Sequence, residues 1–192
     1  MNDIKINGAG VVSGGTYRDV KINGSGKIDN DVNCQHFKVH GSAKAKGNLN
    51  CEKVLVRGAI VIENNLKTNI CDCAGSIRVN GDLISEKTKI AGALKVMGEL
   101  NTDHLIVKSN QSRLNLVHGD KIEILGKWCF WNRRHNEALE IEGSTINVSY
   151  LKAKRLSGDK VTVGPNSVID VVEYRNEYSS HHSAKVNQVI RL

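Results

Sequence analysis

Glycine returns at every seventeenth position along much of this chain. The series begins with Gly24, Gly41 and Gly58 and continues with Gly75 and Gly92. Apolar residues keep the same interval, and the clearest column, eight residues after each glycine, holds Val32, Leu49, Leu66, Leu83 and Leu100. Several columns with one period are the sign of a structural repeat, and stacked repeats of this length indicate a solenoid.

Within one repeat the apolar residues come in pairs two positions apart. Val54 and Val56 form one pair, and Ile60 and Ile62 form the next. This alternation is typical of a strand and not of a helix. The breaks between pairs hold Gly, Asn or Asp, which tolerate the bends that a chain needs at a corner. Each repeat is therefore expected to form three short strands in a triangular coil.

A single coil of three strands cannot bury its inward face, so the coils must stack about 4.8 Å apart with paired backbones. The 192 residues are 40% apolar and only 4% aromatic, which suits one domain with a narrow aliphatic core. The single proline, Pro165, agrees with a chain whose backbone donors are nearly all used. We predict an all-β, single-domain parallel β-helix of roughly ten triangular coils of about 17 residues.

The repeat weakens after Gly126. Leu139, Ile141 and Gly143 still fall on slots of the repeat pattern, but Arg134 replaces an expected leucine. A corner loop is therefore predicted within 127–138. Strand-like pairs return further on, so the β-helix domain is predicted to span 1–174, and the polar residues 175–192 to form a C-terminal cap or tail.

The segment around this loop combines aromatic and basic residues, and two interpretations remain open. In one, Trp128 and Phe130 point inward as an enlarged core pair. In the other, the exposed residues of the segment contact a protein partner or a membrane interface, because Trp beside basic residues suits such a surface. The candidate contact residues are Trp128, Trp131, Arg133 and Arg134.

The cysteine and histidine spacing does not indicate a metal site. Four of the five cysteines occupy repeat columns: Cys34 and Cys51 share one column, and Cys71 and Cys73 replace a valine pair. We interpret them as small inward residues. Stacked Cys34 and Cys51 would be close enough to bridge, but a reducing cytosol would oppose a disulfide. The adjacent His181 and His182 lack a third ligand at a suitable spacing, so solvation is favoured over metal binding.

The formal net charge of +7 raises the question of an anionic partner. One basic column lies beside an acidic column of the same length, which we interpret as mutual charge compensation. A second basic column has no evident acidic neighbour and is the better candidate for binding a polyanion. No aromatic residues interleave with it, so nucleic acid is not an expected partner. This basic stripe consists of Lys27, Lys44, Arg78 and Lys95.

The sequence does not favour an enzyme. Histidines are scattered, no nucleophile, base and orienting group fall together, and the phosphate-binding G-x-x-x-x-G-K-[ST] motif is missing. We therefore predict no catalytic residues, no cofactor and no small-molecule substrate. The N-terminal residues enter the repeat at once, and no run of 18 apolar residues occurs. A cytoplasmic protein is expected, with peripheral contact at the inner face of the membrane as an alternative.

Several repeats are similar to those of a known family. The segments "VKINGSGKI", "VLVRGAIVIENNL", "IRVNGDL" and "KVTVGPNSVIDVVEY" resemble the bactofilins, bacterial polymer-forming cytoskeletal proteins. The resemblance covers Ile4 to about Leu125 and, more loosely, Leu139 to Tyr174. It implies a right-handed β-helix that polymerises end to end without nucleotide and scaffolds other proteins.

The first coil is the predicted place of assembly. The terminal coils of a β-helix present backbone N–H and C=O groups that another chain can satisfy. The predicted interface consists of Ile4, Ile6, Val20 and Ile22. The sequence thus predicts a non-catalytic scaffold that self-assembles into a filament or a homo-oligomer. A dimer joined through N-terminal coils remains an alternative, as does a binding module that uses the segment from Trp128 to Arg134.

Overall fold

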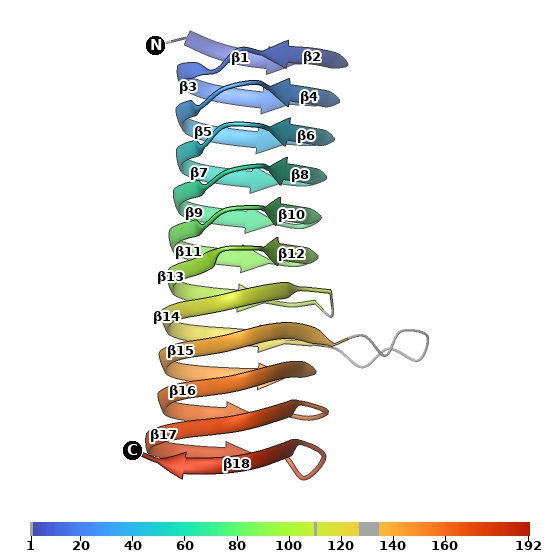
Figure 1. Cartoon of the computed structure of the whole chain (residues 1–192). Coiled ribbons are helices and arrows are strands. Elements are labelled where there is room, and N and C mark those ends of the chain that lie inside the picture. The colour runs from blue at the N-terminus through green and yellow to red at the C-terminus, as the bar shows by residue number, and fades with distance from the viewer. Residues whose placement is uncertain (1, 110, 127–134) are drawn as a thin grey trace.

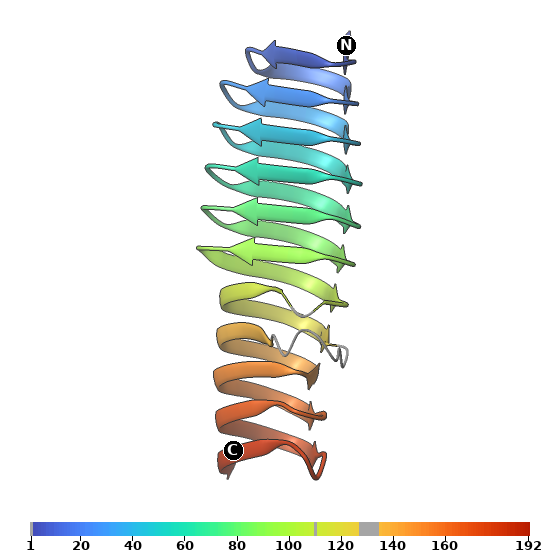
Figure 2. The same cartoon turned by 90° about the vertical axis from the view of Figure 1, so that its right-hand side faces the viewer.

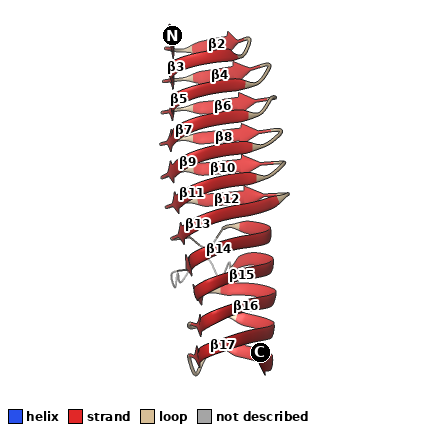
Figure 3. Cartoon of the chain, turned by 90° about the vertical axis from the view of Figure 1, so that its left-hand side faces the viewer, coloured by secondary structure: helices blue, strands red, loops and turns tan. Residues whose placement is uncertain are grey.

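The computed structural model of this protein describes residues 2–109, 111–126 and 135–192. Over these ranges the chain forms 18 strands and no helix, wound into a parallel β-solenoid of about 11 turns (Figure 1). The coils stack into a rod with the two termini at opposite ends (Figure 2). Figure 3 shows that strands dominate every coil and that only short corners separate them. The predicted all-β, single-domain β-helix is confirmed.

The first six coils each contain one longer and one shorter strand, and a seventh longer strand follows them. The longer strands are β1 (Asn2–Ile6), β3 (Gly15–Ile22), β5 (Val32–Val39), β7 (Leu49–Val56), β9 (Leu66–Cys73), β11 (Leu83–Ile90) and β13 (Glu99–Val107). The shorter strands are β2 (Ala9–Val12), β4 (Ser25–Ile28), β6 (Ser42–Ala45), β8 (Ala59–Ile62), β10 (Ser76–Val79) and β12 (Ala93–Val96).

Each coil has three faces, although the longer strand covers two of them. In β7, Leu49 and Cys51 point inward on the first face, which we call face A, and Val54 and Val56 on the second, face B. Two exposed residues between these pairs interrupt the alternation and mark the corner. The short strand β8 forms face C. The predicted three inward pairs per coil are present, but faces A and B share one bent strand.

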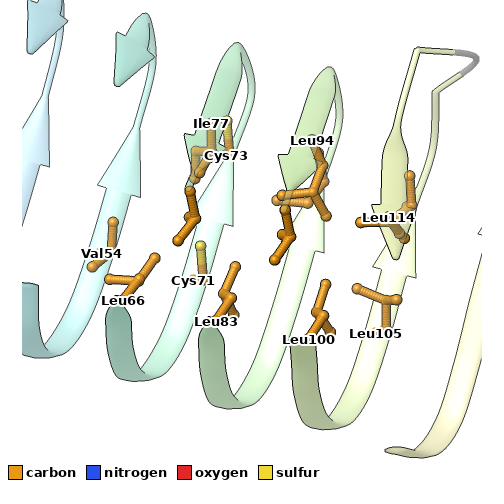
Figure 4. Close-up of a cluster of buried hydrophobic side chains, with 14 of the residues drawn as sticks. Val54, Leu66, Cys71, Cys73, Ile77, Leu83, Leu94, Leu100, Leu105 and Leu114 are labelled. Atoms are coloured by element: carbon orange, nitrogen blue, oxygen red, sulfur yellow. The ribbon is translucent and has the colours of Figure 1, made fainter. Parts of the chain in front are cut away.

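The repeat interval of the sequence equals the number of residues between partners in the register of the stacked strands. Leu49 of β7 pairs with Leu66 of β9, which pairs with Leu83 of β11, and Leu100 of β13 follows. Leu66, Leu83 and Leu100 point into the interior from successive coils (Figure 4). All four leucines are fully buried. A column of identical apolar residues therefore becomes a continuous core along the rod axis.

A second ladder of side chains holds one corner of the N-terminal coils. The backbone N–H of Asn48 donates to Asp31 Oδ1 at 2.7 Å, and the N–H of Asp82 donates to Asn65 Oδ1 at 2.8 Å. The N–H of Glu99 continues the ladder by donating to Asp82 Oδ1 at 2.9 Å. These bonds satisfy backbone donors that the corner removes from the strand pairing. They also lower the pKa of Asp31, whose carboxylate accepts from Asn48.

The last strands are longer and the register changes. They are β14 (Arg113–Leu125), β15 (Asn136–Ser149), β16 (Leu151–Val163), β17 (Val168–Ser180) and β18 (Lys185–Arg191). Asn136 pairs with Leu151, so this coil is two residues shorter than the coil in which Leu49 pairs with Leu66. Each of the two corners that flank face C has lost one residue. From β14 to β17, one strand runs on from face C through faces A and B.

The slots predicted from the regular repeat for Leu139, Ile141 and Gly143 are wrong. Leu139 lies at a corner and is 38% exposed, while the neighbouring Ala138 points inward. Ile141 is buried as expected, but it pairs with Val117 on face A, and Gly143 pairs with Gly119. The physical reason is an insertion before β15 that lengthens the coil without adding a face. Arg113 consequently pairs with Glu137, much further along the chain than the regular interval.

The domain boundaries also differ from the prediction. Residues 127–134 of the predicted corner loop lie outside the described residues, but Asn136–Ala138 already belong to β15. At the other boundary, β17 continues past Tyr174 to Ser180 and β18 pairs in register beneath it. The β-helix therefore does not end at residue 174, and residues 175–192 form its last coil.

Candidate functional site

The first coil forms one end of the rod. β1 pairs with β3 along one edge, and in the described part of the chain no strand pairing involves its other edge. Ile4 lies over Val20, and Ile6 over Ile22. Val20 and Ile22 are fully buried, Ile6 is 8% exposed and Ile4 is half-buried. The prediction that Val20 and Ile22 lie in the interface is wrong because the first coil covers them. The end face offers Ile4 and Ile6.

The last coil forms a second open end, which the sequence did not reveal. Val189 of β18 lies directly beneath the fully buried Val172 of β17, yet its own side chain is 43% exposed. Val186 stacks in the same way beneath Ile169 and is half-buried. These valines occupy inward positions with no further coil below them among the described residues. Because the neighbouring residues are polar, the sequence predicted that these valines belong to a cap or tail.

The predicted basic stripe is one column on face C. Lys27 pairs with Lys44, and Arg78 pairs with Lys95, with Val61 between the two pairs. The structure extends the column beyond the sequence prediction, because the changed register brings further basic residues into line. They are Arg113, Lys152 and Lys185, interrupted by Glu137 and Val168.

Acidic side chains accompany the N-terminal part of this stripe, contrary to the sequence prediction. Lys27 Nζ lies 3.3 Å from Asp29 Oδ1, and Lys44 Nζ lies 2.7 Å from Glu63 Oε1. Lys46 also reaches Asp29, at 3.0 Å. Hydrogen bonds from Lys46 and then Lys27 lower the pKa of Asp29, and Lys44 lowers that of Glu63. Ion pairs as exposed as these contribute little to stability, but they neutralise part of the stripe.

Face C nevertheless carries the positive charge of the described chain. Counting the outward residues of this face and the first residue of the corner that follows, it holds nine Lys or Arg and four Asp or Glu side chains, a net of +5. The rest of the described residues hold 15 basic and 16 acidic side chains, a net of −1. The nine are Lys27, Lys44, Lys46, Arg78, Lys95, Arg113, Lys152, Lys154 and Lys185, and the four are Asp29, Glu63, Glu137 and Asp170.

The other predicted contact segment falls in a part of the chain that is not described. Trp128, Trp131, Arg133 and Arg134 all lie outside the described residues. The residues that flank the segment are Gly126, after face B, and His135, before face C. These two flanking residues lie on either side of the corner that leads into the basic face.

Four cysteines point inward, as predicted. Cys71 and Cys73 are 0% and 1% exposed, and burial raises the pKa of both thiols, for Cys73 to about 11. Cys34 and Cys51 stack on successive coils with their sulfur atoms 2.8 Å apart. Below them the same column continues with hydroxyls: Ser85 Oγ lies 2.8 Å from Thr102 Oγ1 and 2.7 Å from Thr88 Oγ1.

A polar hollow lies near the C-terminal end, where three glycines stack. A Cβ on Gly143 or Gly158 would overlap the carbonyl oxygen of the glycine one coil earlier. The hollow has a volume of about 370 Å³. Two side-chain pairs border it, His118 with Glu142 and Arg175 with Asp159, each at 3.6 Å. The described residues contain no group of three His, Cys, Asp or Glu side chains that could hold a metal ion.

Comparisons with known proteins do not assign this chain to a family. No family model matches the chain. Over 52 residues the chain is 40% identical to "Uncharacterized protein YhbE" of Bacillus subtilis (strain 168). This match covers 27% of the chain and only 22% of that protein. No solved structure matches. Within the described residues there is also no helix long and apolar enough to cross a membrane. Fold and surface therefore define the class of protein, a parallel β-solenoid whose first and last described strands each keep one edge unpaired in the described part of the chain.

Proposed function

We propose that this protein is a non-catalytic scaffold that assembles end to end through its terminal coils, without nucleotide and in the cytoplasm. The observation that carries the proposal is the pair of open ends. Among the described strands, β1 and β18 each pair with one neighbour, and the inward side chains Ile4 and Val189 remain partly exposed there. Burying these side chains and pairing the free strand edges both favour association.

The two ends also determine what can be built. Contact between an N-terminal and a C-terminal end continues the parallel stack and gives a chain that never closes. Contact between two N-terminal ends alone closes after one step and gives a dimer. The resemblance to bactofilins implies the first arrangement, while the geometry of the ends is compatible with both. We favour a filament because core positions are open at both ends.

The test is the assembly state of the purified protein. Light scattering over a range of concentration and salt, with negative-stain microscopy on the same samples, measures it directly. Ile4→Lys places a charge in the end face and is expected to abolish assembly. Val11→Lys is the matched control, because Val11 also lies in the first coil but is 65% exposed on its side. A protein that stays monomeric under all conditions contradicts the proposal.

A second role is favoured by the charge of face C, the docking of the rod on an anionic membrane surface. The basic stripe runs along a sheet face over most of the coils, and its own column contains no aromatic residue, whereas Tyr150 lies at the corner just before this face. A row of cations suits a plane of anionic lipid headgroups better than the bases of a nucleic acid. This role does not exclude end-to-end assembly.

Vesicles test this role. Arg78→Glu with Lys95→Glu is expected to abolish co-sedimentation with vesicles that contain anionic lipid, whereas neutral vesicles should not bind either protein. Lys87→Glu with Lys121→Glu changes the net charge equally on another column and should retain binding. Equal loss with both double variants would indicate unspecific attraction. Loss only with Trp131→Ala and Arg133→Ala would assign the contact to the segment from Trp128 to Arg134.

A further inference from the structure

Two cysteines of successive coils meet in the third and fourth coils. Cys34 of β5 and Cys51 of β7 are direct partners in the strand register. Paired strands lie about 4.8 Å apart, which falls within the range of Cα separations that disulfides span. The two sulfur atoms are 2.8 Å apart. The strand spacing and the contact of the sulfur atoms place the pair within reach of a disulfide bond.

Solvent can reach this pair. Cys34 is 9% exposed and Cys51 is 7% exposed, and both line a surface hollow of about 350 Å³ beside the corner between faces A and B. Asn33, Asn50 and Thr68 border the same hollow. The remaining described cysteines differ, because Cys71 and Cys73 are almost completely buried and line neither of the two described hollows.

We propose that Cys34 and Cys51 are a redox modification site, at which a small-molecule disulfide such as oxidised glutathione, when it accumulates under oxidising conditions, forms an intrachain disulfide between two stacked coils. The pair lies two coils away from the N-terminal end face, so this proposal is independent of the proposed assembly. The oxidised form closes one coil into a covalent ring.

The reaction proceeds by two thiol–disulfide exchanges. One cysteine of the pair, as the thiolate, attacks one sulfur of the small disulfide, forms a mixed disulfide and releases one small thiolate. The other cysteine then loses its proton to solvent, attacks the protein sulfur of the mixed disulfide and releases the second small thiolate. Two protein thiols are oxidised and one small disulfide is reduced to two thiols, so electrons balance.

The two thiols influence each other. The hydrogen bond between them, together with burial, raises the pKa of Cys51. The column itself tolerates the polar change, because Thr68, Ser85 and Thr102 occupy equivalent positions in the next coils.

The consequence is a clamp on the opening of the N-terminal coils. A solenoid loses structure from its ends, since each coil contacts only its neighbours. A disulfide between β5 and β7 prevents separation of these strands when the first coils open. For a ring of this size, the population of the open state should fall on the order of 100-fold.

Peptide mapping tests the site directly. The folded protein is incubated with oxidised glutathione, its remaining thiols are alkylated, and it is digested with trypsin without reduction. Cleavage after lysine separates the two cysteines into the peptides 28–38 and 47–53. We expect these peptides to appear linked, with the loss of two hydrogen atoms, while Cys71 and Cys73 in peptide 68–78 remain alkylated.

Two variants and a second readout make the test decisive. Cys34→Ser and Cys51→Ser should fold, because serine occurs in this column, and neither should give the linked peptide. Hydrogen exchange should show slower opening of the β5–β7 pairing in the oxidised wild type and no change in the variants. A stable mixed disulfide with glutathione, equal oxidation of Cys71 and Cys73, or two thiols that stay free would overturn the proposal.

Discussion

Gly58 lies directly beneath Gly41 at the corner between faces B and C, and a Cβ on Gly58 would overlap the carbonyl oxygen of Gly41. The backbone N–H of Ala59 donates to that same oxygen at 2.8 Å. Gly75 and Gly92 repeat the arrangement. The glycine column is therefore required by close contact between coils. Positive φ among the described glycines occurs elsewhere, at Gly8, Gly14 and Gly15.

Gly58→Ala should destabilise the rod by about 1–3 kcal/mol, because the added methyl group meets backbone that cannot move without breaking the pairing of two coils. The measurement is the free energy of unfolding from urea denaturation. Gly10→Ala is the control, since its methyl group would meet only the flexible side chain of Ile6 at 3.0 Å. Ala43 already occupies the same column. Equal losses in both variants would show that the close approach is not the cause.

Val189→Lys tests whether the C-terminal end takes part in assembly. Val189 occupies an inward position in the last coil, so a charge there should prevent another end from stacking on it. If the protein forms filaments, this variant and Ile4→Lys should each stop them, and light scattering should give dimers or monomers. Gln188→Lys, at an exposed position in the same strand, should leave filaments intact. Filaments that survive Val189→Lys would exclude this end.

Ser85→Ala should cost about 1–3 kcal/mol, because the hydroxyl of Thr88 is fully buried and loses the Ser85 oxygen 2.7 Å away. The double variant Ser85→Ala with Thr88→Val removes both groups and should recover much of that loss. A thermodynamic cycle of the single and double variants measures the coupling. Additive losses would mean that the two hydroxyls do not depend on each other.

The pair Arg155 and Glu173 predicts a pH dependence of stability. Arg155 donates to Glu173 Oε2 from Nε at 3.1 Å, and this bonding lowers the pKa of Glu173 below its usual value of 4.5. The carboxylate therefore stabilises the folded state fully above pH 4.5, and this contribution is lost as the pH falls through the lowered pKa.

Urea denaturation from neutral to acid pH measures the effect. The difference in unfolding free energy between the wild type and Glu173→Gln should be constant near neutrality and should shrink in acid. Glu177→Gln is the control, because the Glu177 side chain is 68% exposed and lies 3.8 Å from Lys160. Its difference from the wild type should vary far less with pH. A difference for Glu173→Gln that does not change with pH would contradict the assignment.

The sequence alone determined the solenoid. A periodic column such as Leu49, Leu66 and Leu83 indicates a stack of coils, because identical residues at one interval lie above one another when each coil buries the inward face of the next. The same periodicity identified the basic stripe from Lys27 to Lys95 and the inward cysteines. The column argument therefore works wherever the coil length stays constant.

Only the tertiary structure decided the features that depend on a changing coil length or on the ends. The coil that pairs Asn136 with Leu151 is shorter than the N-terminal coils, so the alignment of Leu139 and the continuation of the basic stripe could not be read from a fixed interval. Burial of Val20 and exposure of Val189 depend on whether a further coil covers them. The physical reason is that a local pattern specifies which way a side chain points, whereas its neighbours on the next coil decide what it contacts.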